Sequence, residues 1–208
     1  MPTPTLRSIG NIPINSAVVV ACYPSLRAPR KKISALEAEG TLIRLKRGMF
    51  VVNPEVSGVP LSTELVANML YAPSYVSMHT ALCYWGMIPE AVYRVQSMTL
   101  KHSRTFQTPL GTFDYRHIDR MAFSIGLTNR QEGQANFIIA TPEKALCDLI
   151  AQSSDVNLRY KAETLSYLQD YLRLDMEAFA HFRRPLLEQY AVVGKKAGCI
   201  RTLLKLLP

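Results

Sequence analysis

The segment APRKKISALEAEGTLIRLKRGMFVVN, residues Ala28–Asn53, joins a helical pattern to an alternating one, and both halves are basic. Proline is well tolerated only in the first turn of a helix, so the sequence predicts a helix over Pro29–Glu39. Ile33 and Leu36 lie one turn apart and would face the core. Gly40 can adopt the positive φ at which many helices end. The first half is therefore predicted to be an amphipathic helix with a basic first turn.

The residues after Gly40 alternate between apolar and basic, which is typical of a strand. Ile43 and Leu45 would share one face of this strand, with the basic residues on the other. A tight turn is expected to end at Gly48, and the following MFVVN is rich in β-branched and aromatic residues. We predict a hairpin over Thr41–Asn53 with a cationic tip.

Positive charge is concentrated in this region. Residues 27–53 contain seven cationic and two acidic side chains, an excess of five in a chain with net charge +8. Charge alone favours an ordinary solvated surface, because most Lys and Arg side chains are exposed without a ligand. A basic helix followed by a basic hairpin, however, is the arrangement of a winged helix-turn-helix. In such domains phosphate contacts position the protein and helix side chains read base edges.

The residues before Ala28 should supply the rest of the predicted winged helix-turn-helix. NSAVVVACYPS predicts a short apolar helix, capped by Asn15 or Ser16 and ending before Pro24. Residues Met1–Pro13 contain three prolines and a glycine without helical periodicity. The helix-turn-helix is therefore expected to be abbreviated at its N-terminus.

The chain divides by composition into two parts. PEVSGVP resembles a linker, so we predict a winged helix-turn-helix over residues 1–53, a linker over 54–60 and a second domain over 61–208. With 208 residues and 48% hydrophobic content, the chain can bury a substantial core. The predicted fold class is α+β.

The second domain is expected to combine an antiparallel sheet with a helical tail. STELVANMLYA and SMHTALCYWG predict helices, and RTFQTPLGTFDYRHI predicts a hairpin that turns at Pro109 and Gly111. Its return strand would place Phe113, Tyr115 and His117 on one face. NFIIATPEKALCDLIAQ predicts a buried strand running into a helix with Thr141 as its N-cap.

Several functional classes lack a signal in the sequence. No apolar run approaches the length of a membrane span, and the first residues lack the pattern of a secretion signal, so a cytoplasmic location and no membrane partner are expected. The four cysteines are far apart, which favours reduced, mostly buried thiols over disulfides or metal ligands. No cofactor is predicted.

An enzyme would most plausibly use the histidines. His79 and His117 are the candidates, with Asp114, Asp119 or a thiol as partner. His79 and Cys83 lie one helical turn apart, but a lone His–Cys pair is a weak ligand set and packing explains it better. No phosphate-binding glycine loop or nucleophile motif is present, so no catalytic or metal-binding residue is predicted.

A third interpretation is RNA or protein binding by the second domain. VYRVQSMTLKHSRTFQ carries Tyr93, Lys101, Arg104 and Phe106, residue types that stack on bases and contact phosphates. A sheet packed on helices would bury many of these side chains, so core packing is the preferred explanation. A surface that binds another protein could use the same positions.

Four separated phrases, in order, resemble the AbiEi-type antitoxins of bacterial toxin–antitoxin systems. They are PRKKISALEAEGTLIRLKRGMFVV, ELVANMLYAPSYVSMHTALCYWGMIPEAVYRV, RTFQTPLGTFDYRHI and IATPEKALCDLI, and they span most of residues 28–150. The resemblance implies an N-terminal winged helix-turn-helix that represses its own operon. It also implies a C-terminal domain that antagonises a nucleotidyltransferase-like toxin, directly or functionally.

The resemblance places the DNA-reading helix at Pro29–Glu39 and the wing at Thr41–Asn53. Because the first turns of a recognition helix usually face the bases, the candidates for base readout are Arg30, Lys31 and Ser34. The candidates for phosphate contacts are Arg27, Lys32, Arg44, Lys46 and Arg47. Binding as a homodimer to an inverted repeat in its own promoter would compensate for the short N-terminus.

Overall fold

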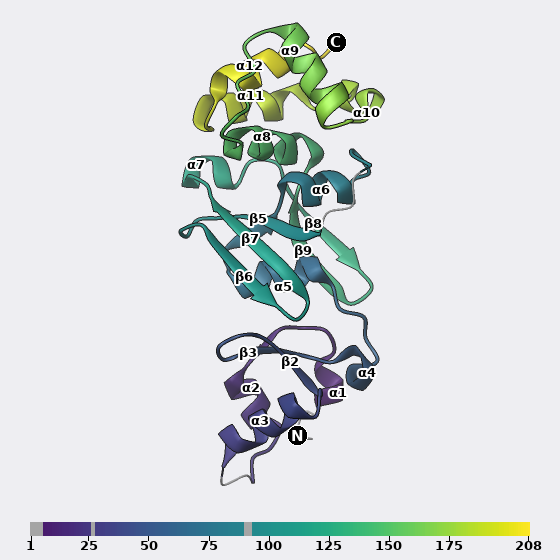
Figure 1. Ribbon diagram of the computed structural model, residues 1–208, viewed down its shortest axis with the longest axis vertical. Coiled ribbons are helices and arrows are strands. Elements are labelled where there is room, and N and C mark those ends of the chain that lie inside the picture. The colour runs from purple at the N-terminus through teal and green to yellow at the C-terminus, as the bar shows by residue number, and fades with distance from the viewer. Residues whose placement is uncertain (1–5, 26–27, 90–92) are drawn as a thin grey trace.

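The computed structural model describes residues 6–25, 28–89 and 93–208. The fold is α+β, with a three-stranded sheet, a six-stranded sheet and many short helices. Figure 1 shows an elongated molecule with the N-terminal elements at one end, the larger sheet in the middle and the C-terminal helices at the other end. None of the helices in the described ranges is long and apolar enough to cross a membrane.

The N-terminal elements surround a small sheet. They are α1 (Leu6–Ile9), β1 (Ile14–Asn15), α2 (Ser16–Ala21), α3 (Pro29–Ala38), β2 (Leu42–Lys46) and β3 (Met49–Val52). The predicted helix and hairpin are present within one or two residues of their expected bounds. The predicted cap is also present, since Asn15 Oδ1 accepts the Val18 N–H at 3.1 Å.

The expectation that no helix precedes Pro13 is wrong. α1 forms one helical turn between the prolines, and β1 pairs antiparallel with β3, which gives the order β1-β3-β2. Leu6 and Ile14 are both buried in the small N-terminal core. Burial of these two apolar side chains accounts for ordered structure that periodicity did not indicate.

The hairpin departs from strict alternation near its turn. Arg44 is opposite Phe50, yet Lys46 is opposite Met49, so Leu45 is an extra residue on its strand. Such a β-bulge bends the strand and re-aims the side chains that follow. The expected common face for Arg44 and Lys46 is therefore wrong.

Two hydrophobic clusters form the core. The smaller cluster lies between α1, α2, α3 and the small sheet, with Val19, Leu36 and Phe50 among its members. The larger cluster fills the rest of the molecule, and it also includes Leu45 and Val51 of the hairpin. The hairpin therefore packs on α3 with one face and on the C-terminal part with the other.

The segment 54–60 is more ordered than a linker. Residues Pro54–Ser57 form the one-turn helix α4, whose first turn is capped by Asn53 Oδ1, which accepts the Glu55 N–H at 3.0 Å. Gly58 ends this helix at φ 72°. α5 (Thr63–Leu70) follows, and Ser62 Oγ accepts the Leu65 N–H at its start.

The six-stranded sheet has the order β6-β7-β5-β4-β9-β8. Its strands are β4 (Ser74–Val76), β5 (Arg94–Thr99), β6 (Arg104–Thr108), β7 (Gly111–His117), β8 (Leu127–Glu132) and β9 (Ala135–Ala140). β5 pairs parallel with β7, and β4 pairs parallel with β9. The predicted antiparallel sheet is thus corrected to a mixed one, because β7 rather than β6 lies next to β5. The β6–β7 hairpin itself pairs without a bulge.

Helices cover both faces of this sheet. α5 lies on one face, where Tyr115 Oη donates to the carbonyl of Ala67 at 2.7 Å. α8 (Pro142–Gln152) lies on the other, where Tyr75 Oη donates to Asp148 at 2.9 Å. The remaining helices in the described ranges are α6 (Met78–Tyr84), α7 (Arg120–Phe123), α9 (Lys161–Ser166), the π-helical η1 (Tyr167–Tyr171), α10 (Met176–Ala180), α11 (Arg184–Val193) and α12 (Ala197–Leu204). The predicted helical tail is confirmed.

Candidate nucleic-acid interface

The first turn of α3 carries unneutralised positive charge. Pro29 occupies its first turn, Ala28 supplies no side-chain cap, and the turn contains no acidic residue. Arg30 and Lys31 are exposed there. Because the N-terminal end of a helix carries a partial positive charge, two cations at this end create a local attraction for anions.

Ser34 lies one turn after Arg30 and is exposed. Its Oγ donates to the Arg30 carbonyl at 3.2 Å, so the hydroxyl proton is used within the helix. The oxygen lone pairs remain available. Ser34 can therefore accept a hydrogen bond from a base edge in this conformation, but it does not donate one.

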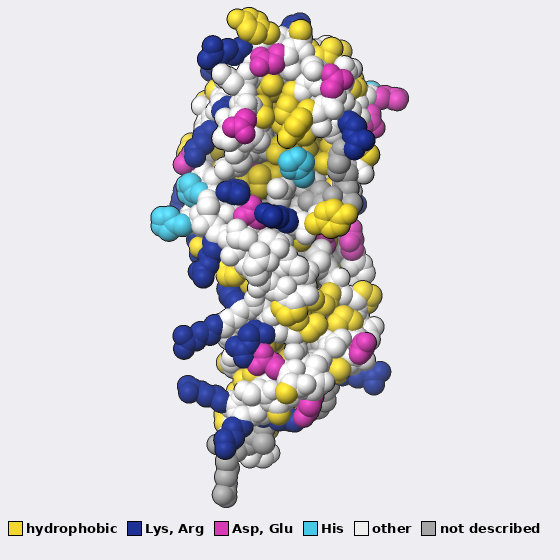
Figure 2. All heavy atoms as spheres, viewed as in Figure 1, with side chains coloured by type: hydrophobic (Ala, Val, Ile, Leu, Met, Phe, Trp, Pro, Cys, Tyr) yellow, Lys and Arg dark blue, Asp and Glu magenta, His cyan; other side chains and the backbone are white. Residues whose placement is uncertain are grey.

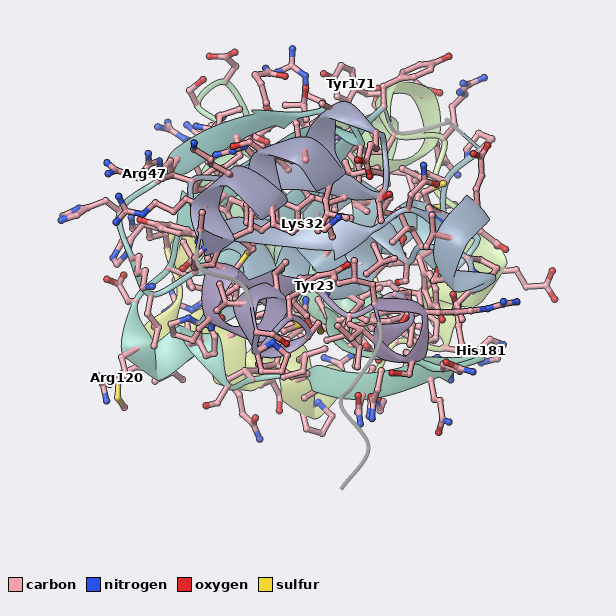
Figure 3. The ribbon with its side chains drawn as sticks, turned by 90° about the horizontal axis from the view of Figure 1, so that it is seen from below. Tyr23, Lys32, Arg47, Arg120, Tyr171 and His181 are labelled. Carbon is pink, nitrogen blue, oxygen red and sulfur yellow. The ribbon has the colours of Figure 1, made fainter. Side chains whose placement is uncertain are left out.

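Lys32 points to a different neighbour. This half-buried side chain places Nζ 5.4 Å from the centroid of the Tyr23 ring, as the view from the N-terminal end in Figure 3 illustrates. Such a cation–π contact ties α3 to the segment that follows α2. Lys32, a predicted phosphate ligand, is therefore already engaged in part by a contact within the protein.

Arg44 links the hairpin to α3. Its guanidinium donates to both carboxylate oxygens of Glu37, at 2.6 and 2.5 Å, and lies 5.2 Å from the Phe50 ring. The hydrogen bonds to Glu37 raise the pKa of Arg44 above its ordinary value. A two-point contact of this kind fixes orientation as well as distance. Arg44 therefore holds helix and hairpin in register, although nearly half of its side chain stays exposed.

Lys46 faces the larger sheet. Its Nζ donates to the Leu70 carbonyl at 2.5 Å and lies 5.8 Å from the ring of Phe106. Burial lowers its pKa, and the neighbouring Lys101 and Arg104 lower it further. The bulge at Leu45 directs Lys46 into this contact, so the structure separates it from the other predicted phosphate ligands.

Arg47 occupies the turn of the hairpin and is exposed. In Figure 3 it lies at the margin of the molecule, whereas Lys32 and Tyr23 lie closer to its centre. None of the ion pairs among the described residues includes Arg47. Arg27, the remaining phosphate candidate, falls outside the described ranges. Figure 2 shows Lys and Arg side chains gathered along one edge, from the N-terminal elements onto the larger sheet.

Three of the four residues considered for RNA binding, Lys101, Arg104 and Phe106, lie around one aromatic stack that includes Tyr71. Phe106 is half-buried and packs against Tyr71 and Tyr115, with ring centroids 5.4 and 5.7 Å away. Arg104 lies 4.8 Å from the Phe106 centroid and Lys101 lies 5.0 Å from that of Tyr71. Tyr93 is 93% exposed and directly precedes β5. Sequence reasoning missed Lys46 as a member of the stack, because its contact joins segments distant along the chain.

The histidines considered for catalysis contact different partners. His79 Nδ1 lies 3.3 Å from Gln96 Oε1, whereas His117 Nδ1 lies 3.1 Å from the Lys101 carbonyl. His117 Nε2 is 3.7 Å from Asp119. Within the described residues, no group of three or more His, Cys, Asp or Glu side chains could hold a metal ion. Cys147 and Cys199 are buried, and Cys22 and Cys83 are half-buried.

A buried charged cluster on α8 escaped the sequence analysis. Lys144 and Asp148 are fully buried and lie 3.0 Å apart. Asp148 also accepts hydrogen bonds from Tyr75, Ser77 and Tyr190, at 2.9, 2.8 and 3.1 Å. The signal was available, because Lys and Asp four residues apart within the apolar run EKALCDLI occupy one face of a helix. The cluster joins the sheet to α8 and α11.

No family model matches the chain, and a search of curated proteins finds no match.

Proposed function

We propose that this chain binds double-stranded DNA through a winged helix-turn-helix and represses its own operon. α2 and α3 would form the helix-turn-helix, and β2 with β3 would form the wing. The observation that carries the proposal is the exposed basic first turn of α3, held against the hairpin by the Arg44–Glu37 pair. A recognition helix needs such support, since base readout depends on a fixed approach to the groove.

The contacts divide the basic residues by role. Arg30 and Lys31 are exposed on the first turn of α3 and are proposed to read base edges, with Ser34 as an acceptor one turn later. Arg47 at the hairpin turn is proposed to contact a phosphate. Arg44 positions the wing, and Lys46 joins the wing to the larger sheet.

We further propose that the C-terminal part antagonises a nucleotidyltransferase-like toxin. Its support is the ordered resemblance of three phrases between residues 64 and 150 to AbiEi-type antitoxins. These phrases correspond to elements of the larger sheet and its covering helices, so the resemblance extends over a continuous packed unit.

The DNA-binding proposal is tested by a salt titration of the full-length chain on its own upstream DNA, with a random duplex of equal length as competitor. Specific binding predicts a clear preference for upstream DNA together with a steep dependence on salt. Arg30→Ala with Lys31→Ala should weaken binding to upstream DNA more than to random DNA. Arg120→Ala with Lys161→Ala is the matched control, because it removes two exposed cations from distant helices. Equal losses on both duplexes for the first pair would overturn the readout assignment.

The antitoxin proposal is tested by co-expression of residues 59–208 with the toxin encoded beside it. The fragment retains the larger sheet and nearly all of the larger hydrophobic cluster. It should therefore restore at least part of the growth that the toxin arrests. Continued arrest with a fragment that is soluble and folded would contradict the proposal.

A further inference from the structure

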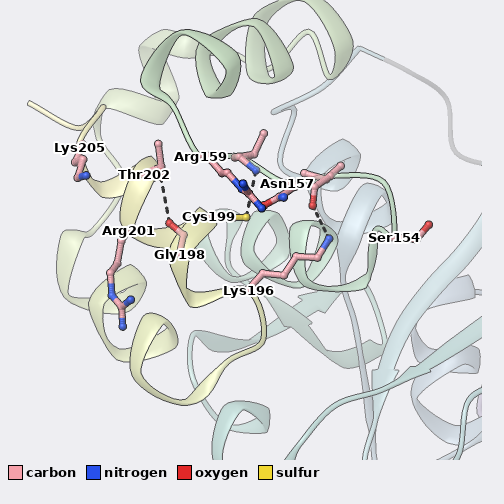
Figure 4. Close-up of a pocket in the computed structure, with 11 residues that line it drawn as sticks. Ser154, Asn157, Arg159, Lys196, Gly198, Cys199, Arg201, Thr202 and Lys205 are labelled. Carbon is pink, nitrogen blue, oxygen red and sulfur yellow. Dashed lines mark hydrogen bonds between the residues drawn. The ribbon is translucent and has the colours of Figure 1, made fainter.

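A cleft opens at the end of the molecule opposite α3. It lies between the segment that follows α8 and the helix α12, and its cavity volume is about 670 Å³. Sites for small molecules in proteins usually measure about 300–1,000 Å³. The cleft is therefore large enough for a nucleotide-sized ligand (Figure 4).

The lining of this cleft is cationic. Arg159, Lys196, Arg201 and Lys205 line it, and the lining contains no Asp or Glu. Arg201 lies on α12, and Lys205 follows four residues later as the C-cap of this helix, so the two side chains share one face, while Arg159 belongs to the opposite wall. Positive charge thus reaches the cavity from two separate walls.

These cations have no carboxylate partner among the described residues. The guanidinium of Arg159 donates to the side-chain oxygen of Asn157 at 3.2 and 3.3 Å when that amide is oriented to accept. Glu163 accepts only the backbone N–H of Arg159. Like charges without counter-ions repel one another, so an anion bound between them would lower the electrostatic energy of the site.

Lys196 shapes the cleft rather than closing it. Its Nζ donates to the carbonyls of Ser153 and Val156, which fixes the segment after α8 against the start of α12. Carbonyl oxygens satisfy hydrogen bonds but leave the unit charge of the ammonium in place. Beside it, Gly198 faces open space, since an added Cβ would meet no atom within 4 Å.

We propose that this cleft binds a small ligand that carries a chain of two or more phosphates, such as a nucleoside triphosphate. Arginine guanidinium groups match phosphate oxygens in pairs, and cations on both walls suit a ligand with several charged groups in a row. The cavity volume accommodates a nucleoside attached to that chain. The site is independent of the proposed DNA interface, which lies at the other end of the molecule.

Calorimetric titration of the full-length chain tests this proposal, with ATP, inorganic tripolyphosphate and adenosine as the probes. ATP and tripolyphosphate should bind at physiological salt, and adenosine should not. Arg159→Ala with Arg201→Ala should weaken ATP binding by at least about tenfold. Arg94→Ala with Arg120→Ala removes the same charge elsewhere, and this control should change affinity by less than about twofold.

A second variant tests the cavity without changing its charge. Gly198→Leu should fill the cleft, retain the circular dichroism spectrum of the wild type and weaken ATP binding by at least about tenfold. Equal weakening by the two arginine pairs would overturn the proposal in favour of diffuse attraction, and so would absence of binding by the wild type. Adenosine that binds as well as ATP would refute the phosphate assignment. A ten-nucleotide single strand that displaces ATP at a lower concentration than ATP itself requires would identify nucleic acid as the ligand instead.

Discussion

Asp148 is a buried anion whose partners come from three directions. Lys144 lies on the same helix, Tyr75 and Ser77 lie on or beside β4, and Tyr190 lies on α11. Burial raises the pKa values of Tyr75 and Tyr190, and the charge of Asp148 raises them further, so both phenols stay protonated as donors. One carboxylate therefore helps to hold the sheet, α8 and α11 together.

Removal of one charge from this cluster should be costly. Lys144→Met leaves Asp148 buried without its ion-pair partner, which destabilises proteins by about 3–5 kcal/mol. The free energy of unfolding in urea measures the loss. Lys161→Met, at an exposed position, is the control and should change stability by no more than about 0.5 kcal/mol. A loss below about 1 kcal/mol for Lys144→Met would show that the hydroxyl donors alone suffice.

The environment of Glu143 should make the stability of the fold depend on pH. Burial alone would raise its pKa, but several hydrogen bonds, led by the one from the Arg183 side chain, together outweigh burial, and the pKa lies below the ordinary 4.5. A carboxyl whose pKa is lower in the folded state stabilises the fold above the unfolded pKa and loses that contribution as pH falls through the folded value. Stability should thus decline below about pH 4.5.

Arg183→Gln should make this acid-side loss smaller, because the guanidinium contacts to Glu143 at 2.9 and 3.3 Å disappear. Urea unfolding at pH 6 and pH 4 measures the difference. Arg120→Gln, exposed on α7, should retain the wild-type difference between the two pH values. An unchanged difference in Arg183→Gln would contradict the role assigned to the pair.

At the scale of elements, the sequence predicted those helices whose ends are marked by their own capping or helix-breaking residues. Pro29 and Gly40 bound α3, Asn15 caps α2 and Ser62 caps α5, as expected from their residue types. Thr141 occupies the predicted N-cap position of α8 but makes no capping hydrogen bond. Periodicity and capping therefore located these helices without tertiary information.

Elements that depend on distant partners could not be predicted in this way. β4 has only three residues, and its strand neighbours are β5 and β9. The parallel β5–β7 pairing arises because the β6–β7 hairpin adds its second strand, not its first, to β5. The site shows the same limit, since neither the bulge at Leu45 nor the Lys46–Leu70 contact is visible in the sequence.

The hairpin yields a prediction that separates two adjacent cations. Arg47→Ala should weaken DNA binding and reduce the slope of its salt dependence by about one. Lys46→Met should leave that slope unchanged, because Lys46 already donates to the Leu70 carbonyl. Parallel salt titrations on one duplex measure both slopes. Equal reductions in the two variants would show that Lys46 leaves its internal contact to bind a phosphate.

At the scale of the whole molecule, the N-terminal and C-terminal parts share a hydrophobic contact. Leu45 and Val51 lie on the hairpin but belong to the larger cluster, with exposed fractions of 3% and 0%. The smaller cluster retains only the side chains around α3 and the small sheet. The proposed DNA-binding part therefore depends on the C-terminal part for a share of its stability.

Separation of the two parts should affect them unequally. A fragment of residues 1–58 exposes Leu45 and Val51 and loses the Lys46–Leu70 hydrogen bond. Each exposed side chain costs about 1.5–3 kcal/mol, which is a large share of the stability of a domain near 60 residues. This fragment should unfold at a much lower urea concentration than the intact chain, whereas residues 59–208 should keep a cooperative transition. Equal midpoints for the fragment 1–58 and the intact chain would show that the hairpin contact contributes no stability to the N-terminal part.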